Sequence, residues 1–90
     1  VLVSHGPPRG VLDTSTPWAD ESLQDHYGSD QLLKYIKRVK PKLVLAGHIH
    51  GSGGLEKILE WDDGSKTICK NTSIMNEDYN IVRNPIEIEI

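Results

Sequence analysis

The stretch Gly47-His48-Ile49-His50-Gly51 is the most informative part of the chain. It follows the apolar run 43–46, which predicts a buried strand that ends at the glycine. Residues two apart in an extended chain point to the same side, so we expect both imidazoles to face one way, with Cα atoms roughly 6–7 Å apart. Such a pair can bind a single metal ion together, or each histidine can bind one of two metal ions that lie about 3.5–4 Å apart. The alternative is that the two histidines have no metal and only form hydrogen bonds at the end of a strand.

The opening of the chain has a similar pattern. Residues 1–4 predict a second buried strand, His5 stands at its end, and the run Gly6-Pro7-Pro8 forces a turn. Ligands for a metal site at the carboxyl edge of a sheet come from strand ends of this kind. The sequence therefore predicts that His5, His48 and His50 form a metal site at one edge of a sheet.

Residues 9–28 show little hydrophobic periodicity and predict a long loop, with a helical turn near residues 20–26. Loops of this length inside compact domains are usually functional or mobile. Two interpretations are open for Trp18, Asp20 and His26: contact with a substrate or partner, or an ordinary surface position. The surface position is the simpler interpretation for His26.

The clearest helix begins at Ser29, which is a good N-cap residue. Asp30 suits the first turn, and Pro41 ends the helix. The strand over residues 43–46 follows, so the order strand, loop, helix, strand predicts two parallel, neighbouring strands. The predicted apolar face of the helix consists of Leu32, Leu33, Ile36 and Val39.

Two strand-like runs, 55–61 and 66–71, flank Asp62-Asp63-Gly64-Ser65, and an Asp-Gly turn between such runs predicts a β-hairpin. Residues 85–90 alternate isoleucine with glutamate after Pro85, which is typical of a half-exposed edge strand. The pattern as a whole predicts an α/β fold in a single unit over residues 1–90. It contains a mixed sheet with a βαβ unit, followed by a β-hairpin and an edge strand.

Composition excludes some classes of protein. A net charge of −3 and a pI near 5.7 argue against general binding to nucleic acid or membranes. No apolar run approaches the roughly 18 residues of a membrane span, and a lone cysteine, Cys69, favours a reducing, cytoplasmic compartment. The basic cluster on the predicted helix fits a solvated face, although nucleic-acid binding is an alternative. It consists of Lys34, Lys37, Arg38, Lys40 and Lys42.

The succession of Ser4-His5-Gly6-Pro7-Pro8 and Gly47-His48-Ile49-His50 resembles the calcineurin-like metallophosphoesterases. The run from His5 to Asp13 is similar to one branch, the MPPED-type phosphodiesterases. So are Pro41-Lys42-Leu43, Asn71-Thr72-Ser73 and Asn84-Pro85. The resemblance covers nearly the whole chain and implies the C-terminal half of an αββα sandwich domain.

The resemblance implies a phosphoester hydrolase, in particular a phosphodiesterase, with two divalent metal ions, which could be Mn, Fe, Zn or Ni. By motif position, His5 and His48 would bind one metal, and His50 would complete the other. Gly6, Gly47 and Gly51 would lie against the substrate, for which the resemblance suggests a cyclic nucleotide. Asn71 or backbone carbonyls would orient the imidazoles.

The upstream motifs of that family, an Asp-x-His, a bridging acidic residue and an Asn-His pair, do not occur in this sequence. The expected general acid belongs to the missing Asn-His pair, so this chain holds no catalytic residue and is expected to act only with the N-terminal half of the domain. Thin apolar content, 37% without Phe, fits a piece of a larger domain, as well as a mature product starting at Val1. A non-catalytic metal-binding or interaction module is the alternative function.

Overall fold

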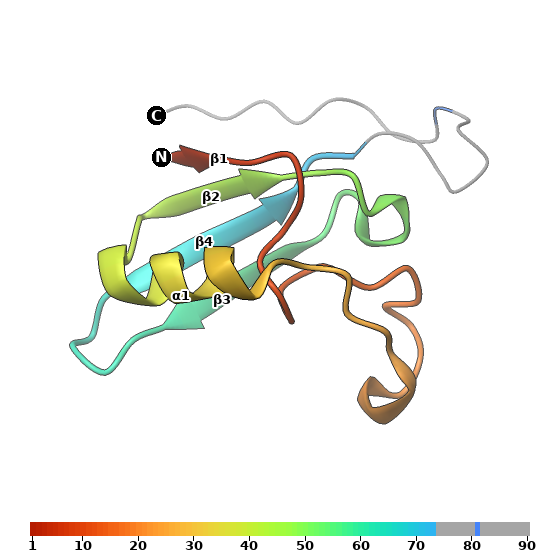
Figure 1. Cartoon of the computed structure of the whole chain (residues 1–90), viewed down its shortest axis with the longest axis horizontal. Coiled ribbons are helices and arrows are strands. Elements are labelled where there is room, and N and C mark those ends of the chain that lie inside the picture. The colour runs from red at the N-terminus through yellow and green to blue at the C-terminus, as the bar shows by residue number, and fades with distance from the viewer. Residues whose placement is uncertain (74–80, 82–90) are drawn as a thin grey trace.

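A computed structural model of the chain describes residues 1–73 and 81. Four strands form one mixed sheet in the order β1-β2-β4-β3, and helix α1 lies against one of its faces (Figure 1). The elements are β1 Leu2–Val3, the 3₁₀ turn η1 Glu21–Leu23, α1 Asp30–Val39, β2 Leu43–Ala46, the 3₁₀ turn η2 His50–Ser52, β3 Glu56–Glu60 and β4 Lys66–Asn71.

The strands β1 and β2 are parallel neighbours joined through α1, as predicted. The helix begins where expected. Ser29 caps it, since its hydroxyl accepts a hydrogen bond of 3.1 Å from the Leu32 N–H. It ends at Val39, where Lys40 takes a left-handed conformation and donates its N–H to the Ile36 carbonyl. The βαβ unit therefore brings the ends of β1 and β2 to the same edge of the sheet.

The predicted hairpin is also confirmed, since β3 and β4 pair antiparallel. The position of β4 was not predicted: it lies between β3 and β2 and pairs parallel with β2, from Leu43 opposite Ile68 to Ala46 opposite Asn71. The edge strand predicted over residues 85–90 lies outside the described residues.

The core lies between α1 and the sheet and consists of Val11, Ile36, Val44 and Cys69, all nearly inaccessible to solvent. Three of the four residues predicted for the apolar face of the helix point toward it. Val39 does not, because it occupies the last position of the helix and its surface is 49% exposed. The long loop contributes Val11 to this core, so part of the loop is packed and not free in solvent.

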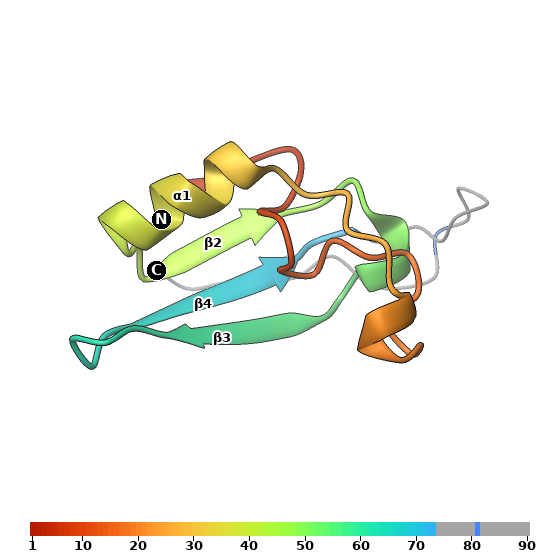
Figure 2. The ribbon, with the colours of Figure 1, turned by 60° about the horizontal axis from the view of Figure 1, so that its bottom comes forward.

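The opposite face of the sheet is covered by no element among the described residues (Figure 2). An apolar row crosses three strands on this face, because Leu43, Ile68 and Ile58 occupy paired positions in β2, β4 and β3. Ile58 is 50% exposed, and Val3 on β1, the strand next to β2, is 70% exposed. Ion pairs of Glu56 with Lys70 and Glu60 with Lys66 flank the row.

Candidate functional site

The ends of β1 and β2 bring His5 and His48 together. The parallel ladder continues beyond both strands, since Ser4 N–H donates to the Leu45 carbonyl and Gly47 N–H donates to the His5 carbonyl, each at 3.0 Å. The two exposed imidazole rings then lie with their centroids 4.6 Å apart and their planes tilted by 38°. The expectation that these strand ends share one edge is confirmed for this pair.

His48 does not continue the strand. Its φ of +67° is left-handed, and the Ile49 N–H donates to the Gly47 carbonyl at 2.7 Å, which closes a three-residue γ-turn around His48. A γ-turn with positive φ is rare and strained for a residue other than glycine. The expectation of an extended chain through this stretch is therefore wrong, because the turn reverses the backbone directly after Gly47.

His50 lies on another element, the 3₁₀ turn η2, where its carbonyl accepts the Gly53 N–H at 3.0 Å. The side chains of His50 and His48 therefore do not lie on the same face of one strand. Within residues 1–73 and 81, no three or more His, Cys, Asp or Glu side chains are grouped so that they could hold a metal. The assignment of all three histidines as metal ligands stays a prediction.

The glycines predicted to contact substrate lie in different surroundings. A Cβ at Gly51 would lie 2.3 Å from the Ser15 carbonyl oxygen, so this glycine is required by the close approach of the loop backbone. Space is open around Gly6, and a Cβ at Gly47 would meet the Ser73 hydroxyl at 3.4 Å. Their contact with substrate stays a prediction.

Asn71 joins three segments at this edge instead of orienting an imidazole. Its buried side chain donates from Nδ2 to the Ile49 carbonyl at 2.9 Å and to the Leu12 carbonyl at 3.3 Å. Its Oδ1 accepts the Ser73 N–H at 3.0 Å. Asn71 therefore holds the strained turn after β2 against the long loop.

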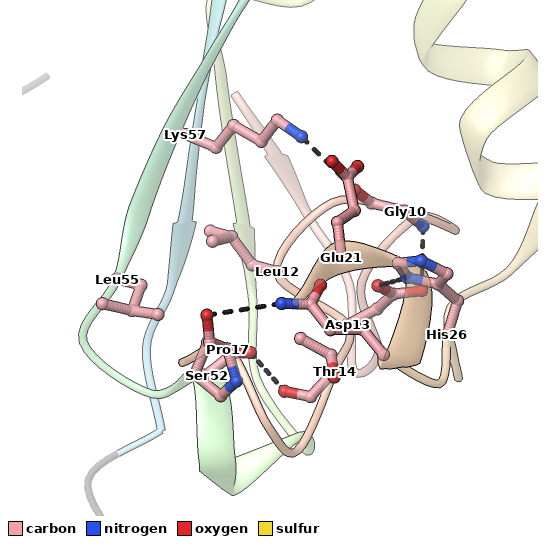
Figure 3. A pocket seen from close by; sticks show the side chains of 11 residues that line it. Gly10, Leu12, Asp13, Thr14, Pro17, Glu21, His26, Ser52, Leu55 and Lys57 are labelled. Atoms are coloured by element: carbon pink, nitrogen blue, oxygen red, sulfur yellow. Dashed lines mark hydrogen bonds and ion pairs between the residues drawn. The ribbon is translucent and has the colours of Figure 1, made fainter. Parts of the chain in front are cut away.

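The sequence did not predict the pair formed by Asp13 and His26. The carboxylate of Asp13, 1% exposed, lies 2.7 Å from Nδ1 of His26 and also accepts the N–H of Gly10 (Figure 3). It accepts the N–H of Gly28 as well. Burial raises the pKa of Asp13, but these hydrogen bonds outweigh it and the net pKa is lowered. His26 is thus not the surface histidine that was expected. Nothing in the spacing of two polar residues within an irregular loop indicates such a contact.

The basic cluster of α1 is partly engaged in local contacts. Lys40 forms an ion pair with Asp63 at 3.1 Å, and the Arg38 guanidinium lies 5.5 Å from the centre of the Tyr35 ring. These contacts give no added support to a nucleic-acid site. Within the part of the chain that the structure describes, α1 and the shorter helical turns lack the length and hydrophobicity of a membrane-spanning helix.

Comparison with known proteins identifies relatives that match the chain from end to end. The metallophosphoesterase domain-containing protein 1 of Homo sapiens and that of Mus musculus are each 35% identical over 91 aligned residues, covering 100% of this chain and 24% of the relative. A UPF0046 protein of Caenorhabditis elegans is 36% identical over 55 residues, or 61% of this chain.

The chain thus spans about a quarter of the length of the mammalian relatives that it matches. No family model and no solved structure matches it. The matching relatives agree with the resemblance drawn from the two histidine motifs. The chain is homologous to the metallophosphoesterase domain-containing proteins.

Proposed function

We propose that this chain supplies His5, His48 and His50 as metal ligands to a metal-dependent phosphoester hydrolase, specifically a phosphodiesterase, that is completed by a further segment of protein. The observation that carries the proposal is the meeting of the His5 and His48 rings at the edge formed by β1 and β2. Homology to proteins named for a metallophosphoesterase domain supports the class of reaction.

The separation of the two rings fits ligands of a single metal. Imidazoles bound to one ion at about 2.0–2.1 Å through cis positions have ring centres roughly 4.5–5 Å apart. The rings of His5 and His48 lie 4.6 Å apart and are exposed, so a metal could approach them. Neutral imidazoles suit Mn, Fe, Zn or Ni. His50 would serve a second metal through a ligand set that also includes residues outside this chain.

When bound, two divalent metals would neutralise phosphate charge and supply a hydroxide near neutral pH. The role of this chain's own residues is to hold the imidazoles at fixed positions. The β1 and β2 ladder fixes His5, the γ-turn fixes His48, and the amide of Asn71 fixes the carbonyl of Ile49 directly after that turn. Such backbone support keeps ligands within the narrow range that a metal requires.

A segment outside this chain is needed for two reasons. Two-metal hydrolysis calls for a bridging carboxylate and a proton donor for the leaving oxygen, and the described residues hold no cluster of three or more His, Cys, Asp or Glu side chains. The open face of the sheet, with its row of Leu43, Ile68 and Ile58, also fits a second layer, as in an αββα sandwich. We assign that layer to the N-terminal half of the domain, and we place the assembled protein in the cytoplasm.

The test compares hydrolysis of bis-p-nitrophenyl phosphate, with added Mn²⁺, by this chain, by the full-length protein, and by full-length His48→Ala. We expect turnover only from the unaltered full-length protein, because His48→Ala removes a metal ligand. Lys34→Ala, at an exposed position of α1, is the matched control and should keep full activity. A cyclic nucleotide replaces the model substrate in a second assay.

Robust turnover by the 90 residues alone would contradict the need for a complementary half. Inactivity of the full-length protein with Mn²⁺, Zn²⁺, Ni²⁺ and Fe²⁺ would favour the alternative, a non-catalytic metal-binding or interaction module. Calorimetric titration of the chain with Mn²⁺ separates these results further. Equal uptake by the unaltered chain and by a variant carrying both His5→Ala and His48→Ala would exclude the metal site.

A further inference from the structure

The long loop closes around one buried charge. The Asp13 carboxylate accepts the N–H of Gly10 at 2.8 Å and the N–H of Gly28 at 2.9 Å through one oxygen, and it bonds His26 Nδ1 at 2.7 Å through the other. A carboxylate with three donors and 1% exposure is fully satisfied. An ionised carboxylate only accepts hydrogen bonds, so Nδ1 of His26 carries the proton.

The residues on either side of Asp13 hold the segment that follows β2. The Thr14 carbonyl accepts a short hydrogen bond from the Ser52 hydroxyl, and the Leu12 carbonyl accepts one from Asn71 Nδ2. The same Asn71 nitrogen donates to the Ile49 carbonyl, next to the turn at His48. The loop around Asp13 is therefore connected on both sides to the backbone that carries His48 and His50.

The far end of the loop packs against the exit from β1. Ser29 N–H donates to the Pro7 carbonyl at 3.0 Å, and Arg9 N–H donates to the Ser29 carbonyl at 3.1 Å. A Cβ at Gly28 would lie 2.4 Å from the Pro8 carbonyl oxygen, so the two backbones are in direct contact. The Gly28 N–H group, which donates to Asp13, therefore lies against the turn that follows His5.

We infer that Asp13 and His26 form a positioning pair, which ties the turn after His5 and the turn after His48 to one loop and so sets the spacing of the candidate metal ligands. This inference rests on the proposed function. Neither side chain contacts the metal or substrate in this role. His26 acts through its Nδ1–H, which together with two backbone N–H groups compensates the buried carboxylate.

A competing role for His26 is proton transfer. Its ring lines a pocket of about 230 Å³ together with Glu21, Gln24 and Lys57 (Figure 3). Within the described residues, no hydrogen-bond partner is found for its Nε2. Proton transfer would require Nε2, whereas positioning requires only the donor at Nδ1. Two substitutions of similar polarity separate these roles.

The experiment compares His26→Asn with His26→Gln in the full-length protein. The amide nitrogen of asparagine takes the place of Nδ1 and can donate to Asp13, whereas the amide nitrogen of glutamine takes the place of Nε2. Neither amide can act as a general acid or base near neutral pH. The Mn²⁺ concentration for half-maximal hydrolysis of bis-p-nitrophenyl phosphate is measured for each. We expect His26→Gln to raise it about 10-fold, the usual scale for groups that orient ligands, and His26→Asn to leave it within about 3-fold.

Equal and severe loss of kcat in both variants, with unchanged Mn²⁺ dependence, would overturn the inference in favour of proton transfer at Nε2. Unaltered behaviour of both variants would also overturn it. A second measurement does not depend on activity: hydrogen exchange of the Gly10, Gly28 and Ser52 amides. Protection should fall in His26→Gln and persist in His26→Asn, while the Val44 and Cys69 amides report that the sheet is intact. If the unaltered protein neither binds Mn²⁺ nor hydrolyses the substrate, the proposed function fails, and the exchange pattern still tests the role of the pair.

Discussion

At the scale of single residues, the conformation of His48 is the feature with the most direct consequence. A left-handed conformation costs a non-glycine residue about 1–2 kcal/mol, and here it places an imidazole beside that of His5. Strain of this kind is kept where the surrounding hydrogen bonds determine the backbone, as Asn71 does here through the Ile49 carbonyl. The strained turn is thus one cost of presenting the imidazole pair.

Replacing His48 by glycine should therefore stabilise the chain relative to replacing it by alanine. Both substitutions remove the imidazole, so the difference isolates the backbone, and we expect a free energy of unfolding about 1 kcal/mol higher for His48→Gly. Urea denaturation monitored by circular dichroism measures it. Alanine and glycine variants of equal stability would show that the turn is not strained in solution.

Asp13 gives a prediction for pH. Hydrogen bonds lower the pKa of its carboxyl group in the folded chain, so its stabilising contribution is present above the ordinary pKa, near 4, and is lost as the pH falls through the folded pKa. The free energy of unfolding should therefore be higher for the unaltered chain than for Asp13→Asn at pH 5. The difference should shrink toward pH 3. A difference that is constant over this range would contradict a lowered pKa.

At the scale of elements, one buried hydroxyl links the β3 and β4 hairpin to the βαβ unit, in addition to the ladder between β2 and β4. The Trp61 indole N–H donates to Thr67 Oγ1 at 2.8 Å, and that hydroxyl donates to the Pro41 carbonyl between α1 and β2. Thr67 is completely buried, so its hydroxyl has no access to solvent. This contact helps explain how β4 lies in register beside β2.

Thr67→Val keeps the shape of the side chain and removes the hydroxyl. The Trp61 N–H and the Pro41 carbonyl then lose their partner, which should lower the free energy of unfolding by about 1–3 kcal/mol. The control is the same substitution in a Trp61→Phe background, where the donor is already absent and the cost should be smaller. Equal costs in the two backgrounds would exclude a role for the indole hydrogen bond.

Local sequence patterns predicted most elements because each depends on near neighbours. Ser29 as a cap, the Asp63-Gly64 turn and the apolar run before Gly47 are signals of this kind, and the structure confirms all three. The insertion of β4 beside β2 depends on contacts between residues far apart in the sequence, such as Val44 with Cys69. A hydrophobic pattern fixes which face a strand buries but does not fix its neighbour.

The candidate site was predictable only in outline. The positions of His5 and His48 at two strand ends indicated their shared edge, and the structure confirms it. The γ-turn at His48 was not predicted, because histidine carries no strong preference for positive φ. The pairing of Asp13 with His26 was missed because irregular loops have no periodicity from which contacts can be inferred.

At the scale of the whole molecule, the uncovered sheet face gives a test of assembly. Ile58 is 50% exposed and Ile68 36% exposed in this chain, so a variant with both changed to Thr should unfold at nearly the same urea concentration as the unaltered chain. In the full-length protein the same variant should be markedly less stable if a second layer covers this face. Ile36→Ala is the control and should destabilise both, since Ile36 is completely buried. Equal effects of the double variant in the two proteins would argue against a covering layer.

The order of the strands also bears on how the chain assembles during synthesis. The strand β4 is the last described strand to be made, yet it lies between β2 and β3 and pairs with both of them. Residues 1–65 by themselves contain β1 paired with β2 on one side and β3 without a partner on the other. The edges of β2 and β3 that β4 will pair therefore stay open in a nascent chain until residue 71 has left the ribosome, and open strand edges of this kind favour aggregation.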